Sequence, residues 1–233
     1  MNSTPVRRTQ LTDEVADRLR NRIITGQVRP GEFIRLDEAA AEFGCSVTPV
    51  REALVTLRGE GLVKSSPHRG FIVDDLGRAD LEDIFWMQAE LSARLARHAV
   101  RSERLESELA ALTTIVDDLE RSVGAGDADR VREHEFEFHR RVNLAGGSKK
   151  LAWFLFAATR YTPHSLYTHD EDWGRQAVAS HRRLIAYLAG GDTEAISIEI
   201  HSRFVDARER LVRSLDAIGF WESSPAVAES IAH

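Results

Sequence analysis

The feature that most constrains the fold is the stretch from residue 36 to residue 73, which combines two short helices with a hairpin. Residues 36–43 have the pattern of a short helix, and Gly44 follows as a turn because glycine tolerates a positive φ. Pro49 lies in the first turn of a second helix, where its missing N–H is not needed. The sequence Pro-His-Arg-Gly at residues 67–70 then separates two short β-strands. This order of elements predicts a winged helix-turn-helix.

The rest of the chain is predicted to be helical. After a break in composition at residues 74–78, apolar residues recur at helical spacing and pairs of glycines separate the segments. We therefore predict a mostly α protein, with an N-terminal winged helix-turn-helix and a C-terminal bundle of about six helices. The predicted domains are residues 1–76, which form the winged domain, residues 79–221, which form the helical domain, and residues 222–233, which form a flexible tail.

Composition and charge exclude several classes of protein. The chain has one cysteine, Cys45, and no run of about 18 apolar residues, so neither an internal disulfide nor a membrane-spanning helix is expected. The start of the sequence lacks the apolar stretch of a secretory signal, and we expect a cytoplasmic protein. The net charge of −6 comes entirely from residues after position 76, while residues 47–73 carry more basic than acidic side chains. A basic segment of this kind is suited to contact with phosphates.

Three polar side chains begin the second helix of the predicted helix-turn-helix. Ser46, Thr48 and Arg51 lie where this fold reaches base edges and phosphates. The guanidinium of Arg51 is able to pair with a guanine or with a phosphate. It is equally able to remain solvated or to pair with Glu52 or Glu60, and its position in the helix leaves both interpretations open.

A second group of polar residues falls within the helical half. Glu135 and His139 are four residues apart and flank an apolar stripe, so both are expected to point into the bundle. His181 lies at the centre of another apolar stripe. Two histidines and a carboxylate on inward faces have the chemistry of a metal site, but they also suit histidines whose hydrogen bonds are satisfied within a core.

Four runs of residues, taken together, resemble the GntR family of transcriptional regulators. They are residues 26–31 (GQVRPG), 44–54 (GCSVTPVREAL), 60–63 (EGLV) and 68–73 (HRGFIV). The helical half, with Phe138-His139, His181 and Gly191-Asp192, resembles the all-helical FCD-type ligand-binding domain of the FadR subfamily. The resemblance covers nearly the whole chain.

The resemblance implies a metabolite-responsive DNA-binding regulator, a repressor that a small organic acid releases from DNA. It also implies that His68, Arg69 and Gly70, at the tip of the hairpin, contact DNA. We expect a homodimer bound to an inverted repeat in double-stranded operator DNA, because a two-fold protein matches a two-fold site. No enzymatic activity is expected, since the sequence has no HExxH motif, glycine-rich phosphate loop or nucleophile elbow. The alternative is a metal-dependent enzyme that uses the Glu/His cluster of the helical half.

In the domains that the helical half resembles, an acidic residue four before a histidine, with a histidine in each of two later helices, binds a divalent metal ion. The resemblance assigns Glu135, His139 and His181 to such a site, for zinc, nickel or manganese. The last ligand position falls on Arg203, whereas His201 lies two residues earlier, about 200° away around a helix. If His201 turns inward, the metal site is complete. If Arg203 turns inward, its charge repels a metal ion and favours a carboxylate effector.

Two further positions depart from the family. Val47 stands where relatives commonly have an arginine, so one DNA contact is expected to be missing. Trp86 stands where many relatives have an arginine near the ligand pocket, which makes it a candidate effector contact. Packing in the core is the favoured interpretation of Trp86, because a large aromatic side chain is usually buried.

Overall fold

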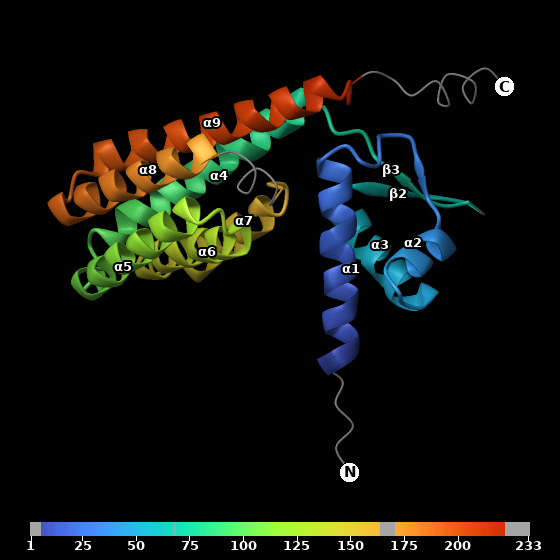
Figure 1. Ribbon diagram of the computed structural model, residues 1–233, viewed down its shortest axis with the longest axis horizontal. Coiled ribbons are helices and arrows are strands. Elements are labelled where there is room, and N and C mark those ends of the chain that lie inside the picture. The colour runs from blue at the N-terminus through green and yellow to red at the C-terminus, as the bar shows by residue number, and fades with distance from the viewer. Residues whose placement is uncertain (1–5, 68, 164–170, 222–233) are drawn as a thin grey trace, which may run out of the picture. The chain divides into compact units, whose positions relative to one another are not determined.

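The computed structural model describes residues 6–67, 69–163 and 171–221. Within these residues the chain is mostly helical, with a small β-sheet in its N-terminal part, and this confirms the predicted fold class (Figure 1). The N-terminal elements are α1 (Val6–Ile24), β1 (Phe33–Ile34), α2 (Leu36–Glu42), α3 (Val47–Gly59), β2 (Val63–Ser66) and β3 (Gly70–Val73). The later elements are α4 (Arg78–Ala99), α5 (Leu105–Gly124), α6 (Ala128–Ala145), α7 (Lys149–Thr159), α8 (Glu171–Gly190) and α9 (Thr193–Ala217).

Contacts divide the described chain into two compact units. The winged unit comprises residues up to 80 together with residues 212–221, which include the end of α9. The helical unit comprises the described part of residues 81–211. The sequence-based boundary placed residues 212–221 in the helical domain, whereas they pack here with the winged unit. The predicted tail, residues 222–233, lies outside the described residues.

The winged unit has a core formed by the packing of α3 against α1 and α2. Leu19 of α1 and Leu54 and Leu57 of α3 are fully buried, because each helix turns one apolar face toward the other. Ser46 is the N-cap residue of α3, and Pro49 lies in its first turn. The backbone amides at the start of α3 therefore lie at the surface of the unit, beside an exposed N-cap.

The hairpin belongs to a three-stranded antiparallel sheet in the order β1-β3-β2. Ile72 of β3 pairs with Phe33 of β1 on one side and with Lys64 of β2 on the other. Phe71 and Val73 alternate with Ile72 and bury their side chains. The sequence predicted the hairpin, but the two-residue strand β1 carried no signal of its own.

A buried ion pair fastens α1 to the end of α3. Arg20 Nε donates to Glu60 Oε2 at 2.8 Å and Arg20 Nη2 donates to Glu60 Oε1 at 2.9 Å, and both side chains are largely buried. Burial lowers the pKa of Arg20, but the hydrogen bonds and charges of Glu60 and Asp17 raise it overall. Arg20 therefore keeps its positive charge in this buried position.

Replacing Glu60 with glutamine should destabilise the winged unit by about 3 kcal/mol, because the charge of Arg20 then lacks its main buried partner. Urea unfolding followed by circular dichroism measures the loss. The matched control is Glu14→Gln, which removes the exposed partner of Arg18 and should have no measurable effect on stability. Equal effects of the two substitutions would contradict this role for the buried pair.

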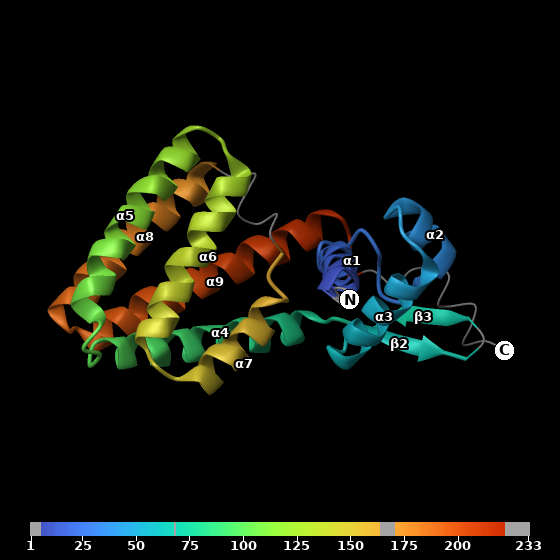
Figure 2. The same ribbon diagram turned by 90° about the horizontal axis from the view of Figure 1, so that it is seen from below.

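The helical unit is a bundle in which α5 packs against both α6 and α8, and Figure 2 shows α5 beside α8. Leu119 of α5, Phe138 of α6 and Leu188 of α8 are fully buried in its core. At Gly146 a Cβ would lie 2.5 Å from the carbonyl oxygen of Leu95, so the absence of a side chain allows the end of α6 to approach α4. None of the described helices is both long and apolar enough to cross a membrane.

The end of α9 and the residues after it complete the winged unit. Ile218 and Phe220 lie against Gly26, where a Cβ would come within 2.5 Å of Ile218 Cδ1. Gly26 also has a φ of +74°, so a larger residue would be strained by its backbone as well. Arg29 donates to the carbonyl oxygen of Ile218 at 2.6 Å and satisfies a group that the end of a helix leaves free. The winged unit thus contains residues from both ends of the described chain.

Candidate functional site

The exposed start of α3 is the first candidate site. Ser46, Thr48 and Arg51 are all exposed, as a surface that meets DNA requires. Val55, one turn after Arg51, is 46% exposed, and an apolar side chain in this place suits the methyl group of a thymine. The sequence analysis missed Val55, although its spacing of four residues from Arg51 was a usable signal.

The charge of Arg51 is not neutralised within the described part of the chain. Arg51 has neither a hydrogen bond nor an ion pair of its side chain to any described residue. Glu60 pairs with Arg20, and Glu52 accepts a hydrogen bond from Thr12 Oγ1 at 3.0 Å. The interpretation in which Arg51 pairs with either glutamate is therefore not the arrangement that the structure has. Its guanidinium remains available for a partner other than the described residues.

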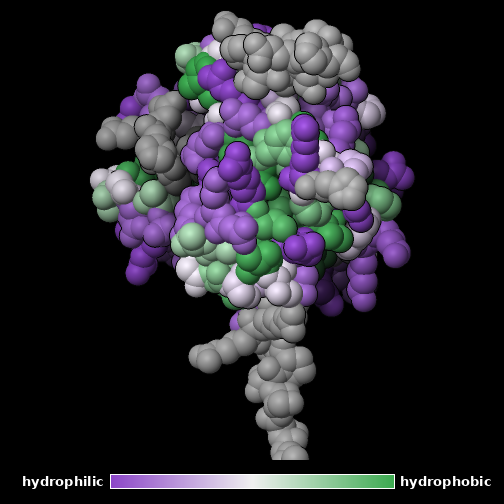
Figure 3. Space-filling model, turned by 90° about the vertical axis from the view of Figure 1, so that its right-hand side faces the viewer, coloured by the Kyte–Doolittle hydropathy of each residue, from purple (hydrophilic) through white to green (hydrophobic). Residues whose placement is uncertain are grey.

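The hairpin between β2 and β3 adds a second set of exposed groups. The guanidinium of Arg69 is exposed and has no hydrogen bond or ion pair to any described residue, and Gly70 has a φ of +97°, a conformation that favours glycine. His68 lies outside the described residues. Figure 3 shows the side of the winged unit that carries the hairpin, with hydrophobic side chains in its middle and hydrophilic side chains around them.

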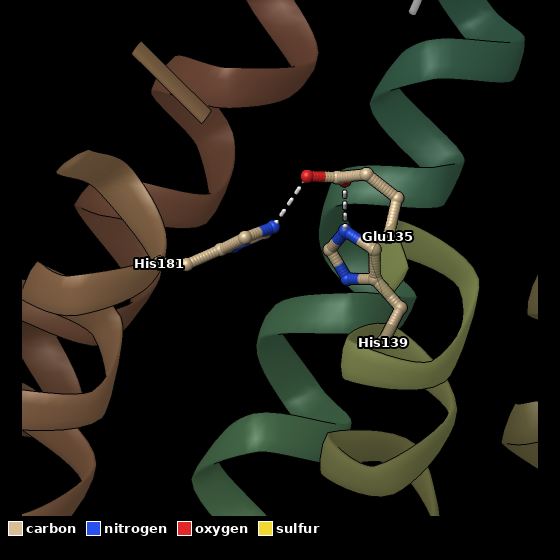
Figure 4. A group of neighbouring side chains, drawn as sticks. All are labelled: Glu135, His139 and His181. Atoms are coloured by element: carbon tan, nitrogen blue, oxygen red, sulfur yellow. Dashed lines mark hydrogen bonds and ion pairs between the residues drawn. The ribbon is translucent and has the colours of Figure 1, made fainter. Parts of the chain in front are cut away.

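The second candidate site lies within the helical unit. Glu135 and His139 come from α6 and His181 comes from α8, and Figure 4 shows their side chains pointing toward one another. His181 Nε2 lies 2.8 Å from Glu135 Oε1, and His139 Nε2 lies 3.5 Å from Glu135 Oε2. One ligand atom from each residue lies within 4.8 Å of the others. The structure therefore brings together the three residues that the sequence assigned to one site.

Arg203 of α9 joins this cluster. Its Nη1 lies 2.6 Å from His181 Nδ1 and 3.1 Å from His181 Nε2, and its Nη2 lies 3.3 Å from Glu135 Oε2. Phe138 stacks on His181 with 3.8 Å between the ring centroids, which holds the imidazole in place. The guanidinium of Arg203 thus stands where the resemblance places the last metal ligand.

His201 lies outside the cluster, which corrects its assignment as a metal ligand. Its Nδ1 lies 2.7 Å from the carbonyl oxygen of Ser197, and its Nε2 lies 3.0 Å from Glu90 of α4. Since His201 and Arg203 are two residues apart on one helix, they point in different directions. Trp86 is 62% exposed, so its expected packing in the core is wrong.

Burial and neighbouring charges fix the protonation of the cluster. Burial, followed by the positive charge of Arg203, lowers the pKa of His181 to about 3, so the ring is neutral at pH 7. Burial raises the pKa of Glu135, but His181, Arg203 and His139 together hold it well below its usual value. A carboxylate only accepts, so neutral His181 carries its hydrogen on Nε2 and donates it to Glu135, while Arg203 Nη1 lies within 3.1 Å of both ring nitrogens. The cluster therefore holds one negative and one positive charge.

This arrangement does not fit a divalent metal ion, although the spacing of the three ligand atoms suits one. His181 Nε2 directs a hydrogen at Glu135, and Arg203 Nη1 lies within 3.1 Å of both ring nitrogens, where it occupies space that an ion would need. Arg203 itself has no lone pair to offer, and it adds a fixed positive charge at the position of the remaining ligand. The expected zinc, nickel or manganese ion would find too few donors here and would be repelled by the guanidinium.

Comparison with known proteins agrees with this architecture. Residues 11–73 match the family described as "Bacterial regulatory proteins, gntR family", and residues 83–203 match the FCD domain. The transcriptional regulator McbR of Escherichia coli is 27% identical over 126 residues, which cover 54% of this chain and 57% of McbR. A Paenarthrobacter nicotinovorans protein named "Probable D-xylose utilization operon transcriptional repressor" is 29% identical over 194 residues, which cover 80% of this chain and 82% of that protein.

Some of these matches are partial. The chain spans a little over half the length of McbR and of YdhC, a regulator from Bacillus subtilis that is 31% identical over 125 residues. The solved structure of Escherichia coli McbR/YncC is similar in fold, with a TM-score of 0.65 and 23% identity, and the match covers 90% of this chain and 99% of that one.

A winged helix-turn-helix followed by an all-helical unit with a polar cluster in its interior defines a class of two-part bacterial regulatory proteins. The chain belongs to the GntR family of this class and carries an FCD domain. The resemblance seen in the sequence is thereby confirmed.

Proposed function

We propose that this protein is a transcription regulator that binds operator DNA through its winged unit and a small organic acid through its helical unit. The observation that carries the proposal is the exposed start of α3, where Arg51 has no partner among the described residues. A guanidinium at this position of a helix-turn-helix suits the O6 and N7 atoms of a guanine. Because relatives are named as regulators and repressors, we propose that the protein is a repressor and that the acid releases it from DNA.

The neighbouring groups complete the proposed DNA interface. The hydroxyls of Ser46 and Thr48, with the free amides at the start of α3, suit phosphate oxygens. Arg69 and Gly70 lie at the tip of the wing, where a cation and a close backbone approach suit the minor groove or the flanking phosphates. His68 is expected to contribute at the same tip.

We also propose that the regulator is a homodimer on an inverted repeat. Three aromatic residues of α7 are largely exposed, Trp153 by 61%, Phe154 by 54% and Phe156 by 52%. Adjacent exposed aromatic side chains are uncommon on a monomer and typical of a protein interface. A two-fold dimer would place two winged units on two half-sites, which increases the number of base contacts.

Selection of duplexes from a random DNA pool tests the proposed function. The enriched sequence should contain an inverted repeat, and native mass spectrometry should show two chains on each duplex. Binding should weaken steeply with added salt, because phosphate contacts release counterions. The absence of any enriched sequence, together with binding that does not respond to salt, would contradict the proposal.

Binding of the acid and binding of DNA should be coupled. The coupling is expected to change each affinity by about 5- to 150-fold and must be the same in both directions. A panel of mono- and dicarboxylates identifies the acid that binds most tightly, and calorimetry with and without the selected duplex measures the coupling. Equal affinities in the two titrations would remove the proposed regulation.

The alternative function, a metal-dependent enzyme, has little support in the helical unit. Glu135 is paired with Arg203 and hydrogen-bonded to His181, so it is not free to act as a base. Both nitrogens of His181 are engaged as well. The names of the relatives point to regulators and not to enzymes.

A further inference from the structure

The cluster in the helical unit contains a cation that the chain supplies itself. Arg203 reaches the group from α9, and its side chain is 19% exposed, so it is sheltered but still open to a solute. We propose that Arg203 is the resident cation of the ligand site, so that this protein takes no divalent metal there and binds the carboxylate of its ligand directly.

The hydrogen bonds of Arg203 leave room for a ligand. A guanidinium has five N–H donors. Within the described residues, Nη1 contacts His181 and Nη2 donates a hydrogen bond to Glu135. The remaining donors of Arg203, including the one on Nε, have no partner among these residues. Two such donors in one plane match the two oxygens of a carboxylate.

Charge within the cluster favours a carboxylate over other ligands. The charges of Glu135 and Arg203 balance, and His181 is neutral. A divalent cation would place two more positive charges beside a fixed guanidinium. A phosphate dianion would place two negative charges beside Glu135. A carboxylate brings a single negative charge, and the half-exposed ring of His139 lies close enough to the cluster to donate a hydrogen bond.

Arg203 also explains the orientation of the other groups without a metal. In a metal site both imidazoles direct a lone pair at the ion, and a second partner holds each ring. Here the hydrogen on His181 Nε2 points to Glu135, and the guanidinium of Arg203 lies against both the ring of His181 and the carboxylate of Glu135. The same protein groups are thus held together by an internal ion pair.

The first test uses metal ions alone. The full-length protein is stripped with a chelator and titrated separately with Zn²⁺, Ni²⁺ and Mn²⁺ by calorimetry. Wild type should bind each of them only weakly at the cluster, and Arg203→His should bind Zn²⁺ at least about 100-fold more tightly than wild type, because the substitution supplies a lone pair and removes the charge. Arg208→His, on the same helix and paired with Glu82, is the matched control and should behave as wild type. Wild-type binding of one ion per chain, as tight as that of Arg203→His, would overturn the proposal.

The second test uses acetate as the probe, with inorganic phosphate for comparison. In an NMR titration, acetate should shift the resonances of residues around the cluster, and it should bind more tightly than phosphate. Arg203→Gln should weaken acetate binding about 10-fold or more, and Arg203→Lys, which keeps the charge but not the fork, should have an intermediate effect. Acetate binding unchanged in both variants, or tighter binding of phosphate, would overturn the proposal.

These tests are independent of DNA. The biological role of the site depends on the proposed function, but neither titration contains a duplex. If no duplex is selected but acetate still binds through Arg203, the proposed regulatory function is rejected and the proposed anion site stands. If a duplex is selected but acetate binding does not depend on Arg203, the proposed anion site is rejected and the proposed regulatory function stands.

Discussion

Replacement of Arg51 by alanine should lower the affinity for the selected duplex by about 10- to 100-fold, which is the effect of losing one bidentate contact to a guanine. The side chain is exposed and has no hydrogen bond or ion pair in the described chain, so its removal should leave the fold unchanged. Fluorescence anisotropy with the selected duplex measures the affinity. Circular dichroism and thermal unfolding verify that the winged unit is intact.

The matched control for this substitution is Arg121→Ala. Arg121 is an exposed arginine of α5 in the helical unit, so its loss changes the net charge of the protein equally. We expect Arg121→Ala to bind the selected duplex as wild type does. If Arg51→Ala retained wild-type affinity at physiological salt, the start of α3 would not be the surface that reads the bases. Equal losses in the two variants would indicate a general effect of charge.

The second large effect is a loss of stability on mild acidification. His181 has a pKa of about 3 in the folded protein and an ordinary value of 6.5 in the unfolded chain. Below pH 6.5 the unfolded chain therefore takes up a proton that the folded protein excludes, and stability falls as the pH decreases. The lowered pKa of Glu135 acts in the same direction, but only below about pH 4.5. Between pH 6.5 and 4.5 the helical unit should lose roughly 1 kcal/mol for each pH unit.

Urea unfolding at a series of pH values measures this slope. His181→Gln removes the ionisable ring and should flatten the slope between pH 6.5 and 4.5, even if the variant is less stable throughout. His201→Gln is the control, because it removes a histidine from the same unit but leaves the buried ring in place, and it should retain the wild-type slope. The same slope in wild type and His181→Gln would show that His181 is not the group responsible.

The winged unit was predictable from the sequence because its signals are local. The turn at Gly44 and the proline in the first turn of α3 each depend on neighbouring residues alone. The inward position of Glu135 and His181 was also predictable, since each lies within an apolar stripe at helical spacing.

The choice between His201 and Arg203 was not predictable from the sequence. Apolar residues flank both positions on α9, and the spacing does not say which face turns inward. The structure distinguishes them by partners that are distant in the sequence: Glu135 and His181 for Arg203, and Glu90 for His201. Trp86 was placed in the core because of its size, but it lies on an exposed face of α4 that nothing within the described chain covers.

The contact between Gly26 and Phe220 has a consequence for how the protein is made. The ribosome releases residue 26 before it makes α6, α8 and α9, whereas Ile218 and Phe220, which pack on Gly26, follow these helices in the sequence. The winged unit is therefore incomplete until α6, α8 and α9, which supply the Glu135, His181 and Arg203 cluster, have emerged. A prematurely terminated chain would lack Phe220 and would leave apolar surface of the winged unit uncovered. Completion of the proposed DNA-binding part is thus postponed until the proposed ligand-binding part has been translated.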